Sequence, residues 1–183
     1  MDYSGKLLIA TPSLLDENFH QSVVLLIRGN DDDGVLGLVL NRESSKTINE
    51  LWQTIFEESC RTVGNLHIGG PVPGPLMALH TNADIGDFEV SPGVYCAASR
   101  EALEVLAEGE SIPFRFFVGN AGWGNGQLVR EINEGAWYLA EASAEIVFAD
   151  ETEIWQELIA LVGRQILHEV VPTDFFPRDP SLN

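Results

Sequence analysis

Short apolar runs, each stopped by a turn rich in glycine or proline, follow one another along most of this 183-residue chain. Short runs bounded by such turns are typical of β-strands and not of long helices. The chain has 17 glycines and 9 prolines, enough for many turns. The pattern predicts strands at residues 6–10, 22–27, 35–40, 66–68, 76–81, 88–90, 94–97, 114–118 and 137–141.

Helix start signals appear between these strands. Thr47 with Glu50 three residues later is a capping box, in which each side chain satisfies an amide of the other residue. Further helices are expected at 99–108, at 127–133 and from about residue 150 onward. Strands and helices mix without a regular βαβ rhythm, so the chain is predicted to be α+β. One domain over residues 1–183 is expected, with two lobes meeting near residue 98 and a flexible or docking tail at 172–183.

The charge balance is strongly acidic, with a net charge of −18 from 10 basic and 28 acidic residues. Nucleic-acid binding depends on clustered lysines and arginines that neutralise phosphates, and the basic residues here are scattered. A field of this sign also repels anionic membranes at long range. We therefore expect neither a nucleic acid nor a membrane as partner, and we interpret the acidity as solvated surface.

Neither export nor cofactor binding has a signature in the sequence. Cys60 and Cys96 are 36 residues apart with no CxxC motif, so both are expected to be reduced core thiols. No apolar stretch approaches the ~20 residues that span a bilayer, and the chain is predicted to be cytoplasmic. The histidines show no metal-ligand spacing, so no metal or cofactor is predicted; they are His20, His67, His80 and His168.

The glycine-rich segment 119–126 lies between a predicted strand and a predicted helix, where backbone amides could hold a phosphate. Its spacing matches neither GxGxxG nor GxxxxGK, and no lysine lies nearby. Trp123 stands where a phosphate cradle needs bare backbone. The sequence favours a tight turn with Trp123 packed in the core.

Two other places could carry chemistry. Arg42 follows Asn41 at a strand end, where it could hold a carboxylate or phosphate with two hydrogen bonds. It could equally pair with an acidic neighbour while Asn41 caps a turn. His80 lies on the same strand face as Leu76 and Ala78, and a lone histidine there is more often a hydrogen-bonded core residue than a base.

Several of these segments together resemble the AlgH family, also called YqgE-like proteins. The similarity covers residues 5 to about 160, and its order and spacing are more specific than any one piece. The matching pieces are Gly5 to Pro12, Phe19 with Ser22 to Leu26, Gly37 to Arg42, Gly69 to Val72, Leu79-His80, Gly122-Trp123, Gly126 to Leu128 and Gly135 to Trp137.

The resemblance implies a bifurcated, largely antiparallel sheet folded into a pseudo-barrel with helices packed outside, in a bacterial protein. The family often carries the label of transcriptional regulator, which brings no agreed biochemical activity. This chain departs from the family pattern at several positions where the usual residue is polar. It would therefore lack parts of any catalytic centre that the family builds from those residues, which argues against an enzyme. The departures are at Gly29, Glu43, Pro75 to Met77, Asn120 and Val129.

We therefore predict a regulatory or scaffold domain that binds a protein or a small molecule. The alternative is an enzyme for a small anionic substrate, with Arg42 as anchor and His80 as acid or base. Direct DNA binding is not expected, and the oligomeric state stays open. The residues predicted to line one candidate cleft are Asn41, Arg42, Gly69, Gly70, His80, Trp123 and Gln127.

Overall fold

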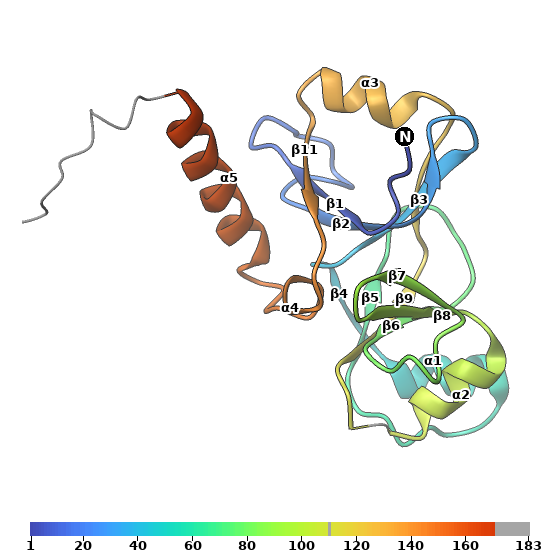
Figure 1. The fold of residues 1–183 in the computed structure, drawn as a ribbon. Helices are drawn as coiled ribbons and strands as arrows, with labels where there is room; N and C mark the ends of the chain where they lie inside the picture. The colour runs from blue at the N-terminus through green and yellow to red at the C-terminus, as the bar shows by residue number, and fades with distance from the viewer. Residues whose placement is uncertain (110, 171–183) are drawn as a thin grey trace, which may run out of the picture.

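A computed structural model describes residues 1–109 and 111–170, and the predicted tail at 172–183 lies outside these residues. The chain forms two sheets and five helices within the described residues, which confirms the α+β class (Figure 1). The first sheet has the order β10-β3-β2-β1-β11, and neighbouring strands are antiparallel. Its strands are β1 (Lys6–Ala10), β2 (Val23–Asn30), β3 (Gly34–Val39), β10 (Ala121–Trp123) and β11 (Trp137–Glu141).

The second sheet has the order β4-β5-β9-β6-β8-β7, and only the β5–β9 pair is parallel among its described strands. Its strands are β4 (Glu43–Thr47), β5 (Asn65–Ile68), β6 (Met77–His80), β7 (Phe88–Ser91), β8 (Val94–Ala97) and β9 (Phe114–Val118). The chain enters this sheet after β3 and returns to the first sheet after β9. Residue 98, where two lobes were expected to meet, lies inside the second-sheet segment, between β8 and α2.

Three of the five helices in the described residues cover the outer faces of the sheets (Figure 1). They are α1 (Ile48–Phe56), α2 (Arg100–Ala107), α3 (Gln127–Asn133), α4 (Ala144–Val147) and α5 (Ile154–Val170). The predicted capping box of Thr47 and Glu50 begins α1, and the Ser99 hydroxyl caps α2. In Figure 1, α3 covers the first sheet, α1 and α2 cover the second, and α4 and α5 lie to one side.

Alternation along the strands divides the core into layers. Leu7 and Ile9 of β1 face the space between the sheets, whereas Leu8 faces α3. Residues 23–27 of β2 alternate in the same way and are buried on both faces, as their continuous apolar run predicts. Helices α4 and α5 close one side of the space between the sheets with Val147, Ile154 and Leu158.

Two residues are less buried than an apolar side chain in the core. Leu161 of α5 is exposed, because the face of the helix that packs against the core carries Ile154, Leu158 and Val162. Cys96 is a buried free thiol as expected, whereas the free thiol Cys60 is only half-buried, since it lies in the connector after α1.

The two sheets are joined where glycines allow their backbones to touch. The amide of Val39 at the end of β3 donates to the carbonyl of Gly69 at 2.8 Å, and the Gly69 amide donates to Val118 at 2.9 Å. Val72 and Asn120 exchange two further backbone hydrogen bonds beside this point. One backbone segment therefore connects β3 of the first sheet to β9 of the second, which is the bifurcation that the family resemblance implies.

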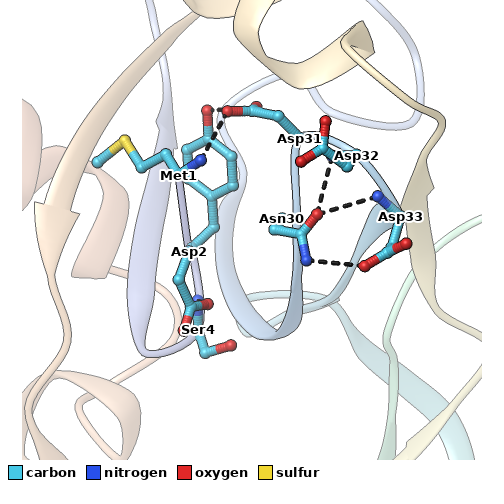
Figure 2. Close-up of polar contacts among 8 residues, drawn as sticks. Met1, Asp2, Ser4, Asn30, Asp31, Asp32 and Asp33 are labelled. Atoms are coloured by element: carbon cyan, nitrogen blue, oxygen red, sulfur yellow. Dashed lines mark hydrogen bonds and ion pairs between the residues drawn. The ribbon is translucent and has the colours of Figure 1, made fainter.

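Hydrogen bonds of the Asn30 side chain stabilise the turn between β2 and β3 (Figure 2). The Asn30 side-chain oxygen accepts hydrogen bonds from the amides of Asp32 and Asp33, at 2.8 and 3.0 Å. The Tyr3 hydroxyl donates to Asp31 at 2.8 Å, and burial raises the pKa of Tyr3 to about 12. The acidic turn is thereby fixed against the segment that precedes β1.

Candidate functional site

A cavity of about 550 Å³ opens where β4 begins, beside β9 and the segment that joins α4 to α5. Of the predicted cleft residues it contains Asn41 and Arg42. It also contains Arg115, which the sequence analysis did not select. The lining residues are Gln21, Asn41, Arg42, Glu43, Arg115, Phe148, Ala149, Asp150, Glu151, Thr152, Trp155 and Gln156.

Asn41 connects the rim of this cavity to the start of β2. Its side-chain oxygen accepts from the Val23 amide at 2.9 Å, and its side-chain nitrogen donates to the Gln21 carbonyl at 2.8 Å. Gln21 has a φ of 53°, in the left-handed region that side chains other than glycine rarely adopt. The oxygen and the nitrogen of the Asn41 side-chain amide therefore both stabilise the strained turn at Gln21. This agrees with the interpretation of Asn41 as a residue that caps a turn.

Arg42 lies half-buried between two backbone carbonyls. Its guanidinium donates to the carbonyl of Asn41 at 3.2 Å and to the carbonyl of His20. Burial lowers the pKa of Arg42 from its ordinary value, although arginine stays charged at neutral pH. The same side chain also lines a smaller cavity of about 170 Å³ that includes Gly70. The carboxylate partner that the sequence analysis considered is not seen within the described residues.

Arg115 reaches the opposite wall of the cavity from β9. It donates to the carbonyls of Val147, at 2.8 Å, and Ala149, which fixes the α4–α5 segment to the second sheet. Burial lowers the pKa of Arg115, against the opposing effect of Glu151, Asp150 and Glu43. The sequence did contain a signal for this residue, since it is one charge inside the aromatic run 114–117 of a strand with partners on both sides.

A histidine–carboxylate contact lies behind the cavity. His67 Nε2 is 2.6 Å from Glu151 Oε2, with the two side chains 7% and 22% exposed. The contact is an ion pair when the His67 ring is protonated. Burial lowers the pKa of His67, and the nearby Glu151 carboxylate opposes that shift. Glu43 lies opposite His67 in the β4–β5 ladder.

The other predicted residues lie away from this cavity. Gly69 and Gly70 form the junction between the sheets, described above. Trp123 is 4% exposed, and its indole donates to Glu131 at 2.9 Å, which confirms the expected core position. Gln127 donates to the same carboxylate at 2.8 Å. The seven predicted residues are thus divided between this cavity, the sheet junction, the underside of α3 and the second sheet.

His80 is fully buried in β6 and is hydrogen-bonded, as a lone histidine on an apolar face is expected to be. Its Nδ1 atom accepts from the Asn82 amide at 3.2 Å, so this nitrogen carries no proton. The ring stacks on Tyr95 with the centroids 6.1 Å apart. Burial lowers the pKa of His80 below its ordinary value of 6.5, against an opposing effect of Asp87.

A pH-dependent stability follows from the neutral state of His80. Between pH 6.5 and the lower pKa of the folded state, the unfolded chain binds a proton that the folded chain does not. We expect this contribution to stability to be complete above pH 6.5 and to be lost as the pH falls. His80→Asn keeps an acceptor near the Nδ1 position and does not titrate. The fall in unfolding free energy between about pH 7 and about pH 5.5 should therefore be smaller in this variant.

Urea denaturation at the two pH values measures the effect, with His20→Asn as the control at an exposed histidine. The control should keep the wild-type pH dependence. An equally steep pH dependence in His80→Asn and in the wild type would contradict a buried neutral His80.

Comparison with known proteins places the fold in a family. The model of the AlgH-like family, DUF179, matches residues 7–167, which is most of the chain. The chain belongs to the AlgH-like family. It is 39% identical over 166 residues to the UPF0301 protein CT0663 of Chlorobaculum tepidum, covering 87% of this chain and 86% of that protein. It is 40% identical over 167 residues to a UPF0301 protein of Chlorobaculum parvum, covering 87% of each.

Solved AlgH-like structures have the same fold. The AlgH protein of Pseudomonas aeruginosa superimposes with a TM-score of 0.73 at 27% identity, covering 90% of this chain and 89% of that one. Protein DIP2367 of Corynebacterium diphtheriae gives a TM-score of 0.69 at 25% identity, covering 85% of each chain. No described helix of this AlgH-like chain has the length and apolar character to cross a membrane. The described residues also contain no group of three or more histidine, cysteine or acidic side chains placed to bind a metal ion.

Proposed function

We propose that this AlgH-like chain is a regulatory domain that binds a small molecule in the cavity between Arg42 and Arg115. The observation that supports this proposal most is the set of contacts that the two guanidiniums make. Both line one cavity, both donate to backbone carbonyls, and neither forms an ion pair with a carboxylate within the described residues. In a chain with a net charge of −18, cations without a paired carboxylate are available for an anionic group of a ligand.

The shape of the cavity supports the same proposal. Its volume of about 550 Å³ is within the range of roughly 300–1,000 Å³ that is usual for small-molecule sites. Phe148 and Trp155 provide apolar surface on one wall, and the Trp155 indole donates to the Ala10 carbonyl at 2.8 Å, which holds that wall against β1. The backbone contacts of Arg42 and Arg115 hold their guanidiniums in place before a ligand arrives, which lowers the entropic cost of binding.

The enzyme alternative of the sequence analysis paired Arg42 with His80. His80 is not among the residues that line the Arg42 cavity, and its Nδ1 atom already accepts a backbone hydrogen bond. We therefore propose ligand binding without assigning a reaction to this pair.

The test is a thermal-shift screen of small carboxylates and phosphates, followed by calorimetric titration of each hit. We expect Arg42→Ala to weaken binding of a hit by at least about tenfold, because a hydrogen bond to a charged group contributes about 1.5–3 kcal/mol. Arg42→Lys should fall between the wild type and Arg42→Ala, since lysine keeps the charge but not the planar pair of donors.

Arg61→Ala is the matched control, because Arg61 is 82% exposed and does not line this cavity. It should bind each hit as tightly as the wild type. Thermal unfolding without ligand shows whether Arg42→Ala remains folded. A hit whose affinity is the same in folded Arg42→Ala and in the wild type would refute the proposed site.

A further inference from the structure

The Arg42–Arg115 cavity also contains carboxylates, and their arrangement indicates the chemical class of its ligand. Glu43, Asp150 and Glu151 line the same space as the two arginines. Among the described residues, none of these three side chains forms an ion pair with either guanidinium. Two arginines and three carboxylates therefore line one cavity, and no ion pair joins an arginine to a carboxylate among these residues.

Each carboxylate has its own partner outside the set of arginines. Glu43 accepts from the Asn65 side chain at 3.1 Å, and Asp150 accepts from the amide and hydroxyl of Thr152 at 2.9 and 2.6 Å. Glu151 contacts His67. The charges of both signs are thus held at the wall by local contacts, as the arginines are held by backbone carbonyls.

We infer that the ligand of this cavity is a small zwitterion of the amino-acid type. The inference rests on the proposed function, because it assigns the ligand's carboxylate to Arg42 and Arg115. Its ammonium group binds Glu43, whose second oxygen has no hydrogen-bond partner within the described residues. Phe148 and Trp155 contact its apolar side chain.

Electrostatic complementarity selects this class over ligands of one charge. An anion alone would bind the arginines in a cavity that three carboxylates also line, and a cation alone would bind the carboxylates beside two guanidiniums. Like-charge contacts of this kind disfavour binding, whereas a zwitterion offers an opposite charge to both groups. The effect is strengthened in a partly enclosed site, where charges interact more strongly than in bulk water.

The experiment compares ligands that differ by one charge and share a side chain. L-phenylalanine carries both charges, hydrocinnamate lacks the ammonium group, and phenethylamine lacks the carboxylate; L-leucine, isocaproate and isoamylamine form a second set. In calorimetric titration, the amino acid of at least one set should bind at least about tenfold more tightly than either of its analogues. A difference of about tenfold is the effect expected from one charge-assisted hydrogen bond.

Glu43→Gln should weaken amino-acid binding by about tenfold and leave the binding of the carboxylic acid unchanged or stronger. Glu134→Gln is the matched control, because it changes the net charge equally at an exposed residue that lines no part of this cavity. It should leave both affinities unchanged.

The remaining outcomes separate the inference from the proposed function. Equal affinity for the amino acid and the carboxylic acid, with both weakened in Arg42→Ala, would overturn the zwitterion and leave the anion site in place. Binding of the amine alone would overturn both. No binding in either set at about 10 mM ligand would overturn the amino-acid ligand, while a hit from the carboxylate and phosphate screen that is weakened in Arg42→Ala would leave the anion site in place. Equal loss of amino-acid binding in Glu43→Gln and Glu134→Gln would assign the effect to net charge and would overturn the role of Glu43.

Discussion

Replacing Gly70 by alanine should destabilise the folded state by about 3 kcal/mol or more. A Cβ atom at this position would lie 2.3 Å from the carbonyl carbon and oxygen of Asn120, which is backbone and cannot rotate away. The φ of Gly70 is +153°, a value that residues with a side chain rarely adopt. Chemical denaturation of the variant and the wild type measures the loss, which is a large part of the ~5–15 kcal/mol typical of a domain.

Gly122→Ala is the control in the same part of the fold. Gly122 lies in β10, has no positive φ, and has no atom within 4 Å of the position of its absent Cβ. Its substitution should change the free energy of unfolding by less than about 1 kcal/mol. Similar unfolding free energies for Gly70→Ala and Gly122→Ala would contradict the close contact of backbones at the sheet junction.

The close approach of backbones at the junction explains why a glycine pair stands at this point of the sequence. A Cβ atom at Gly69 would lie 2.4 Å from the carbonyl oxygen of Gly119, so the backbones cross at both glycines with no room for a side chain on either. Every hydrogen bond that joins the sheets here is between backbone atoms. A sequence motif of this kind is equally expected at a ligand site and at a crossing of backbones, and only the three-dimensional contacts distinguish them.

Local patterns were sufficient to predict most elements of the fold. The apolar run 6–10 is β1 residue for residue, because its alternate side chains fill two different core layers. The capping signals at Thr47 and Ser99 begin α1 and α2, because they satisfy amides within a few residues of themselves. Such features depend on near neighbours, which the sequence contains.

The elements that were missed either depend on partners elsewhere in the chain or are too short to show a period. β4 consists of the polar residues 43–47 and is a strand only because it pairs with β5. β10 has three residues and is held by β3, about 85 positions earlier in the chain. The four residues of α4 are too few for a helical period, although Ser143 does cap them. None of these elements has a periodicity of its own.

The candidate site was predicted in part for the same reason. Asn41 and Arg42 were identified from their place at a strand end, and both line the cavity of about 550 Å³ described above. Arg115 joins them from more than 70 residues away, and Glu151 from more than 100, so no local motif connects the set. His80 shares a strand face with apolar residues, and that observation correctly predicted burial.

A polar cluster beneath α3 is a second structural feature that a motif search does not find. Glu131 Oε2 accepts from the indole nitrogens of Trp123 and Trp137, each at 2.9 Å, and Oε1 accepts from Gln127 at 2.8 Å. Phe19 packs against both indole rings. One carboxylate thus connects β10, α3 and β11, and it accounts for the positions of Trp123 and Gln127 without a ligand.

Glu131→Ala should therefore destabilise the fold by about 3 kcal/mol, because two buried indole donors lose their acceptor and each such loss costs about 1–3 kcal/mol. Glu131→Gln should cost less, since its amide oxygen still accepts from an indole. Glu134→Ala, on an exposed residue of the same segment, should stay within about 0.5 kcal/mol of the wild type. Urea denaturation followed by tryptophan fluorescence measures all three variants. If Glu131→Ala were as stable as Glu134→Ala, water would have to replace the carboxylate as acceptor for both indole nitrogens. Trp123 and Gln127 would then again be candidates for a binding surface.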